Sequence, residues 1–315
     1  MNRANRSMAG KLAATRRLSW QRKEHYTAGV FLLPALILLL IFLIIPFFRA
    51  IYLSFTNERL VVGPLPVHFV GLSNYTQLLS DDSLQRALLN NSLFGMIVVP
   101  LETGLSLFMA ILVNRKMRGV VVFRTIFFSP VVTPLVVVAV VWSFLYNPGQ
   151  GLINDFIRTV SFGHLGPYDW LEDTRLALPA IMILSIWQGV GFQMVVYLVG
   201  LQAIPGELYE AARVDGAGTL QQFWYITVPQ LRNSTIFVLI STTILSFKLY
   251  TQIEVMTQGG PQNATTTIVW YMVHESIHNL RVGYASAVAL VFFCLVLVRI
   301  IPVLWSVMKT EEREL

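Results

Sequence analysis

Charged residues and cysteine are both scarce in this sequence. Only 13% of its 315 residues are Asp, Glu, Lys or Arg, whereas a soluble domain carries roughly 25%. The one cysteine is Cys294, so no disulfide can form within the chain. The low charge excludes an ordinary water-soluble domain, and the single thiol excludes a fold held together by internal disulfides.

Apolar residues make up 55% of the chain and occur in long blocks. Residues 28–48 and residues 176–201 contain no charged side chain. At 1.5 Å per residue each block is long enough to cross roughly 30 Å of hydrocarbon. The first block exceeds the ~7–15 apolar residues of a signal peptide, so we expect it to remain as a membrane span.

The formal net charge of +6 reflects basic residues at particular places in the chain. Seven of them precede the first apolar block: Arg3, Arg6, Lys11, Arg16, Arg17, Arg22 and Lys23. Another cluster, Arg115, Lys116 and Arg118, separates two apolar blocks. Basic residues in short loops mark the cytoplasmic side of a membrane protein. The positions of the basic residues therefore indicate how the chain is oriented in a lipid bilayer, and nucleic acid is not expected as a partner.

An all-α polytopic membrane protein with six transmembrane helices fits these blocks best. The expected spans are residues 28–55, 89–113, 120–146, 176–201, 233–255 and 283–307. An even number of spans places both termini on one side, which the basic residues make the cytoplasm. The domain boundaries that follow are a basic tail at 1–27, a permease domain at 28–308 and a short cytoplasmic tail at 309–315. The segment 147–175 is rich in Gly, Pro and Asp and is expected to form turns.

The cytoplasmic segment 202–230 is expected to fold as two short helices. Pro205 suits the first turn of a helix and Gly216 suits its end, and Thr219 with Gln222 matches a capping box for a second helix. The segment carries five large apolar side chains: Leu208, Tyr209, Phe223, Trp224 and Tyr225. An exposed apolar surface of this size indicates docking on a partner, and the alternative is a loop lying on the lipid headgroups.

The same segment resembles the EAA loop of the permease subunits of ABC importers. The resemblance is carried by Glu210-Ala211-Ala212, Gly216, Ile226 and Pro229. The departure is Val228, where the family usually has Leu. Further stretches look like the sugar-transporting branch, close to the larger permease of the maltose importer. They are 52–56 (YLSFT), 71–75 (GLSNY), 123–130 (FRTIFFSP) and 256–261 (MTQGGP), so the resemblance extends over about residues 29–308.

The resemblance implies a type I ABC importer permease core in the bacterial inner membrane. In that family the EAA loop is a coupling helix that sits in a groove of a separate ATPase, where Glu210 would pair with a basic residue. The implied coupling residues are Tyr209, Glu210, Ala211, Ala212, Asp215, Gly216 and Ala217. The sequence has no G-x-x-x-x-G-K-[ST] phosphate loop. We therefore expect no enzyme activity and no cofactor in this chain, because ATP and Mg would bind to the partner.

The resemblance also implies the partners and the cargo. The partners would be a second related permease, two copies of the ATPase and an extracytoplasmic solute-binding protein. The cargo would be a carbohydrate, and oligosaccharides, monosaccharides, polyols and glycerol phosphates all remain open.

Polar residues in two spans are the candidate substrate path. Ser185, Gln188, Gly189 and Phe192 recur at i, i+3, i+4 and i+7 and so share one helix face; the next expected span provides Thr242, Ser246 and Lys248. Their positions are similar to the substrate-contacting stretches of the maltose permease. The alternative is that small polar residues mediate helix packing. Glu102, costly in hydrocarbon, is interpreted as structural.

Two other classes of function have some support in the sequence. Residues 274–278 read His-Glu-Ser-Ile-His and match H-E-x-x-H, which on a helix can bind zinc in a metalloprotease. No third ligand is evident nearby, so no metal site is predicted. A secondary transporter would usually show internal repeats, and none is found.

Overall fold

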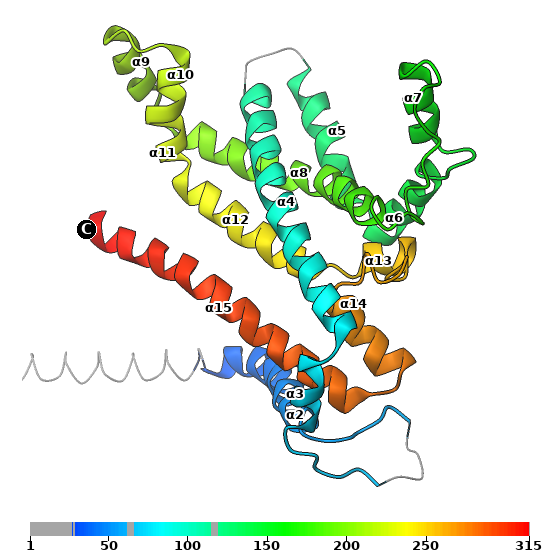
Figure 1. Cartoon of the computed structure of the whole chain (residues 1–315). Coiled ribbons are helices and arrows are strands. Elements are labelled where there is room, and N and C mark those ends of the chain that lie inside the picture. The colour runs from blue at the N-terminus through cyan, green and yellow to red at the C-terminus, as the bar shows by residue number, and fades with distance from the viewer. Residues whose placement is uncertain (1–26, 28, 62–65, 115–118, 315) are drawn as a thin grey trace, which may run out of the picture.

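The structure is a computed structural model that describes residues 27, 29–61, 66–114 and 119–314, with side chains up to residue 298. Throughout this part of the chain the regular structure is helical (Figure 1). The only sheet-like contact there is an isolated antiparallel bridge between Thr56 and Phe69. The basic residues of the tail at 1–26 and the cluster at 115–118 lie outside the described residues.

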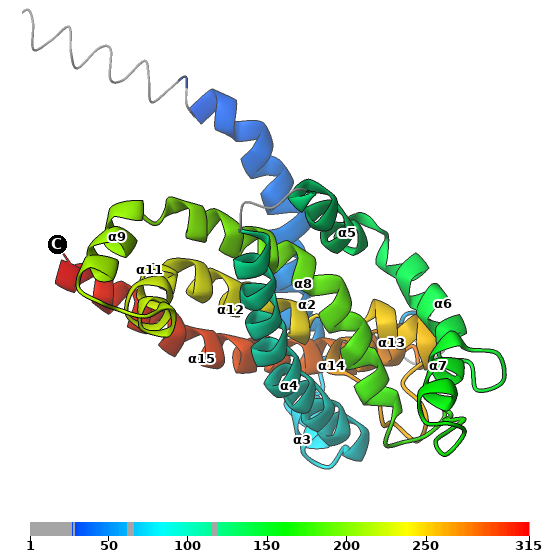
Figure 2. The ribbon, with the colours of Figure 1, turned by 90° about the horizontal axis from the view of Figure 1, so that it is seen from above.

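The first long helix, Gly29–Leu53, extends away from the rest of the chain (Figure 2). It contains a π-helical turn, η1 (Leu40–Ile44), and continues as α2 (Ile45–Leu53). None of the residues in its most apolar stretch is buried inside the chain. Its contact with the rest is made by α2 with α15 (Val282–Glu314), where the rings of Phe47 and Phe293 lie 5.4 Å apart.

The centre of the fold is α4 (Asp82–Val113), which follows the short helix α3 (Ser73–Leu79). It packs against α8 (Ala177–Ala203) along much of its length, and also against α12 (Arg232–Phe247) and α5 (Val120–Val132). All of these are apolar helices with small residues at the contacts. A Cβ on Gly191 of α8, for example, would collide with the carbonyl of Phe127 in α5. Close backbone approach of this kind is how helices associate in lipid.

The stretch expected as one span at 120–146 is a bent pair of helices. After α5 the chain turns by 101° into α6 (Leu135–Leu145). The break lies at Thr133, which is extended, and Pro134, which caps α6; a residue before proline is pushed out of the helical region. The following segment, expected to form turns, contains the helix α7 (Leu152–Val160).

Between α8 and α12 the chain forms α9 (Gly206–Val214), α10 (Thr219–Gln222), η2 (Phe223–Thr227) and α11 (Val228–Gln230). These elements lie at one end of the molecule, and α7 lies at the opposite end in both views (Figures 1 and 2). After α12 come α13 (Thr251–Met256), α14 (Ile268–Val273), η3 (His274–His278) and α15.

By length and composition, three helices of the described residues are able to cross a membrane, or four if the bent pair counts as one span. The three are Gly29–Leu53, α4 and α8. The other two candidates are shorter, because α12 has 16 residues and the apolar helical part of α15 is Val282–Val298. The six-span arrangement and the side on which the termini lie therefore stay predictions.

Candidate functional site

The helix α9 ends in a defined backbone turn. Its last residues are followed by Gly216 at φ +81°, in the left-handed region. The amide of Gly216 donates to the carbonyl of Arg213 at 3.1 Å, and the amide of Ala217 donates to that of Ala212 at 2.8 Å. This pair of bonds is a Schellman motif, which favours glycine at the left-handed position. The glycine predicted to end the helix therefore does so.

The N-cap of the second helix, α10, lies one residue earlier than predicted. Gly218 is the N-cap of α10, and its amide donates to the side-chain oxygen of Gln221 at 2.8 Å. The pair Thr219 and Gln222 proposed for a capping box is wrong, because Gln222 donates instead to the carbonyl of Ala217 at 2.9 Å. Both glutamines tie α10 to the turn that follows α9.

A hydrogen bond holds α9 against η2. The hydroxyl oxygens of Tyr209 and Thr227 are 2.9 Å apart, and these residues line a cavity of about 270 Å³ together with Leu201 at the end of α8 and Asn114 after α4. The loop therefore lies beside the ends of these two long helices. Of the seven predicted coupling residues, Glu210, Ala211, Asp215 and Gly216 are exposed, and Tyr209, Ala212 and Ala217 are half-buried.

The exposed face of this loop is rich in apolar side chains. Val214 is 88% exposed, Tyr225 80% and Trp224 58%. Since aqueous surfaces rarely expose contiguous large apolar groups without a partner, this end of the molecule is suited to docking.

A second cavity, of about 170 Å³, lies between α4, α6, α8 and α12 and the segment that follows α12. It brings together six of the seven residues predicted for the substrate path: Ser185, Gln188, Gly189, Thr242, Ser246 and Lys248. Ser185, Thr242 and Ser246 are buried, and Lys248 is exposed at the C-terminal end of α12. Polar residues of two separate helices, α8 and α12, therefore face the same cavity.

Phe192 does not join this cavity. Its ring is 42% exposed, and it is absent from the residues that line the space. Phe192 lies about one further turn along α8 from Gly189. It therefore lies beyond the cavity on the surface of the chain.

The structure adds three polar residues that the sequence interpretation did not include in the path. Glu102 and Gln252 line the cavity, and Gln193 lies directly behind it. The side-chain nitrogen of Gln193 donates to Oε1 of Glu102 at 2.5 Å and to the hydroxyl of Thr242 at 2.6 Å. This amide connects α8 to both α4 and α12. Gln193 lies four residues after Gly189, which puts both on the same face of α8. This spacing was the signal in the sequence that could have identified Gln193.

Gly189 makes room for the buried carboxyl. A Cβ built at this position would overlap Oε1 of Glu102. The side chain of Glu102 is only 5% exposed, and burial of a polar group without partners is unfavourable. The missing side chain at position 189 and the amide of Gln193 together accommodate the acid.

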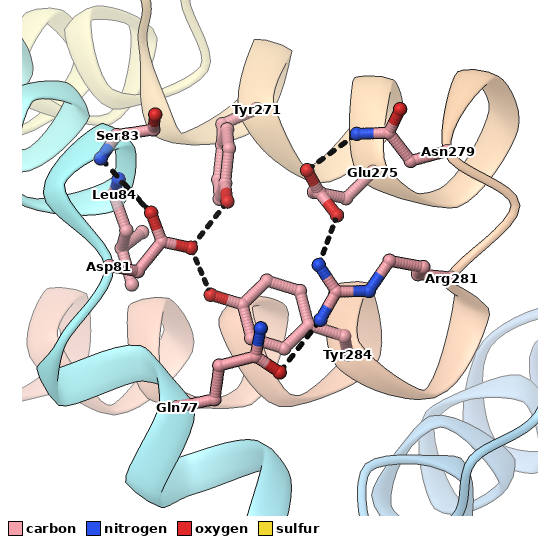
Figure 3. A network of polar contacts seen from close by, with 9 residues as sticks. All are labelled: Gln77, Asp81, Ser83, Leu84, Tyr271, Glu275, Asn279, Arg281 and Tyr284. Carbon is pink, nitrogen blue, oxygen red and sulfur yellow. Dashed lines mark hydrogen bonds and ion pairs between the residues drawn. The ribbon is translucent and has the colours of Figure 1, made fainter.

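A separate polar network joins α3, α4, α14, η3 and α15 (Figure 3). Asp81, the N-cap of α4, accepts hydrogen bonds from the amides of Ser83 and Leu84 and from the hydroxyls of Tyr271 and Tyr284. Burial by itself would raise the pKa of Asp81, but these hydrogen bonds to the charged form outweigh it and lower the pKa. The carboxylate therefore holds the two tyrosine-bearing helices against the start of α4.

The H-E-x-x-H motif occupies η3 and has a structural role there. Glu275 is buried, forms an ion pair with Arg281 at 3.2 Å and accepts a hydrogen bond from Asn279 at 2.7 Å. The rings of His274 and His278 stack face to face with centroids 4.9 Å apart. Over the described ranges, no group of three or more His, Cys, Asp or Glu is placed to hold a metal ion. The geometry argues against the protease alternative, because the acid that would act as general base is already paired.

Apolar helices around a polar cavity, with an exposed helical loop at one end, define a subunit of a membrane transporter. The family profile described as "Binding-protein-dependent transport system inner membrane component" matches residues 102–307, more than half of the chain. The chain therefore belongs to this family of inner-membrane transport components, and the secondary-transporter alternative is set aside.

Relatives support the same assignment over nearly the whole length. The chain is 37% identical to the probable ABC transporter permease protein PH1215 of Pyrococcus horikoshii, over 90% of this chain and 96% of the relative. It is 34% identical to the trehalose/maltose transport system permease protein MalF of Thermococcus litoralis, over 87% and 91%.

The fold is that of a solved ABC transporter. A crystal structure of a bacterial alginate ABC transporter, in complex with an alginate pentasaccharide-bound periplasmic protein, superposes with a TM-score of 0.79 at 21% identity. The match covers 91% of this chain and 96% of the other. The ABC importer permease fold that the EAA loop implied is thus confirmed.

Proposed function

We propose that this chain is one of two permease subunits of a carbohydrate ABC importer and that residues 202–230 transmit the motion of a separate ATPase to the cavity. The observation that carries the proposal is the connection of the loop to the cavity. The helix before the loop, α8, provides Ser185, Gln188 and Gly189, and the helix after it, α12, provides Thr242 and Ser246. A displacement of the loop must therefore move both walls of the cavity.

The loop has the properties of a docking element. Its rigid helix α9 is fixed at one end by the turn at Gly216 and on one side by the Tyr209–Thr227 hydrogen bond. Glu210 and Ala211 remain exposed. Glu210 is available to pair with a basic residue of the ATPase, while the other predicted coupling residues shape the surface around it. ATP and Mg would be bound entirely by the two ATPase subunits.

The cavity has the size of part of a cargo path. Its volume of about 170 Å³ is below the ~300–1,000 Å³ of a pocket that encloses a ligand. A second, related permease would contribute the missing wall, and a solute-binding protein would deliver the cargo. The hydroxyl and amide groups of Ser185, Gln188, Thr242 and Gln252 suit the hydrogen-bonding pattern of a sugar.

The topology that goes with this function has six spans with both termini in the cytoplasm. In addition to the three long apolar helices and the bent pair, α12 and α15 would then cross the bilayer. The helices α13 and α14 would lie on the outer side, opposite the coupling loop.

The test is purification of the tagged chain from its native membrane. We expect two copies of an ATPase and one related permease to accompany it, and the complex to accumulate a labelled sugar in an ATP-dependent manner. A cysteine introduced at Ala211 should crosslink to the ATPase. A chain that transports its cargo alone, with no nucleotide-binding partner, would refute the proposal.

A further inference from the structure

The cavity contains an acid that the proposed coupling does not use. Of the lining residues, Glu102 alone carries a carboxyl group, and Lys248 is the one that carries a positive charge. Glu102 lies deep between α4 and α8 and is 5% exposed, whereas Lys248 is exposed at the end of α12. The inner part of the cavity therefore presents an acid, and the cation lies at its edge.

The position of Glu102 is fixed by two neighbours. Gly189 leaves the space that its carboxyl fills, and Gln193 donates a hydrogen bond to Oε1. Gln193 is itself held, because it also donates to Thr242 at 2.6 Å and accepts from Ser106 at 3.5 Å. A side chain held from two helices has a defined direction.

One oxygen of this carboxyl has hydrogen-bonding capacity to spare. All the hydrogen bonds found for Glu102 within the described part of the chain involve Oε1. A carboxyl group, ionised or protonated, accepts hydrogen bonds at both oxygens, and a buried polar oxygen is stabilised when it has a partner. Oε2 therefore offers an acceptor to a hydroxyl group that enters the cavity.

We propose that Glu102 is a cargo-binding residue, positioned by Gln193, and that the cavity selects uncharged, hydroxyl-rich cargo over anionic cargo. The inference deepens the proposed function and rests on it. Sites that bind carboxylates or phosphates use Arg or Lys as direct partners. Here an anion that reached Ser185 and Thr242 would lose its water with no cationic side chain beside it, because Lys248 lies at the exposed edge of the cavity, and an unpaired buried charge is unfavourable. A neutral sugar would donate its hydroxyl groups to Glu102 and Gln188.

The experiment measures uptake by the complete importer in cells, with three uncharged probes (maltose, trehalose and cellobiose) and two anionic probes (glycerol 3-phosphate and glucuronate). Glu102→Leu is compared with Leu101→Ala, a change at the neighbouring exposed position of α4. We expect the wild type to take up at least one uncharged probe. For that probe the apparent KM should be roughly 10- to 100-fold higher in Glu102→Leu than in the wild type. Leu101→Ala should match the wild type.

The conservative variant Glu102→Gln separates cargo contact from packing. It preserves shape and the bond to Gln193, so it should fold like the wild type and retain part of the uncharged uptake. Wild-type uptake of only the anionic probes would overturn the inference and leave the importer assignment in place, as would an unchanged KM in Glu102→Leu. If no probe accumulates, the inference fails because none of its uncharged sugars is accepted, whereas the importer assignment is tested separately by co-purification of the ATPase.

Discussion

Gln193 of α8 donates a hydrogen bond of 2.6 Å to the hydroxyl of Thr242 in α12, and the loop 202–230 connects these two helices. The bond lies beside the cavity, so it links the cavity walls at the point where the loop's motion would separate them. The contribution of this bond to stability can be measured, because the neighbouring Thr243 of α12 serves as a matched control.

Thr242→Val should lower the stability of the chain by about 1 kcal/mol more than Thr243→Val does. Both hydroxyls donate to the carbonyl four residues earlier at 2.7 Å, the bond of Thr242 being buried and that of Thr243 exposed, so the two changes remove local bonds of the same geometry. The difference reports the bond to Gln193, and thermal unfolding in detergent measures it. Equal destabilisation by the two variants would show that the bond between the helices contributes nothing.

Glu210→Lys should abolish uptake while the chain still inserts in the membrane. The reversed charge would face the basic residue expected on the ATPase, and like charges at an interface are strongly unfavourable. Uptake and co-purification of the ATPase are the measurements. Glu207→Lys, which also reverses an exposed acid of α9, is the control and should retain uptake. Normal transport by Glu210→Lys would remove this residue from the coupling role.

Gly216→Ala should destabilise the loop and reduce uptake. Position 216 has φ +81°, where an L-residue with a Cβ costs roughly 1–2 kcal/mol. Gly206→Ala is the matched change, since no atom lies within 4 Å of the added methyl group at either glycine and only Gly216 has a positive φ. Protease sensitivity of the loop and sugar uptake should change in Gly216→Ala alone. Identical behaviour of both variants would contradict the conformational argument.

Gln188→Ala should weaken uptake without altering the basal ATPase rate. The change removes one amide from the cavity and leaves the coupling loop untouched, so we expect an increase in the apparent KM of roughly tenfold. Val199→Ala, at an exposed position of the same helix, is the comparison. A Gln188→Ala importer with wild-type KM would exclude this face of α8 from the cargo path.

Acid should destabilise the polar network around Asp81. The pKa of Asp81 is lowered in the folded chain from its ordinary value of 3.8. A depressed pKa means that the contribution to stability is fully present above the ordinary value and is lost as the pH falls through the folded value. Unfolding temperatures measured between pH 6 and pH 3 should therefore drop more steeply in the wild type than in Asp81→Asn. Asp82→Asn, an exposed neighbour, should follow the wild-type curve.

Residue type and helical period were sufficient to predict much of the candidate site from the sequence. The three- and four-residue spacings predicted which side of α8 faces the cavity, and Gly216 could be assigned to the end of α9 because few other residues adopt a left-handed turn. The same reasoning missed Glu102, since nothing in a single sequence indicates that a residue of α4 lies against Gly189 of α8. It also misplaced Phe192, because a shared helix face does not specify how far a cavity extends along the helix, and Phe192 lies about 10 Å along α8 from Ser185.

The sequence by itself determined that this protein is a membrane-embedded helical transport subunit with a segment that resembles the ABC coupling loop, because apolar runs, basic clusters and the Glu210–Gly216 motif are local properties. Only the tertiary structure decided that the stretch 120–146 bends by 101°, that H-E-x-x-H is a structural ion-pair site and that Glu102, Gln193 and Thr242 meet at one cavity. The meeting of Glu102, Gln193 and Thr242 depends on contacts between segments up to 140 residues apart, as from Glu102 to Thr242. Such contacts are fixed by how helices pack against one another, and the pattern within any one helix does not specify them.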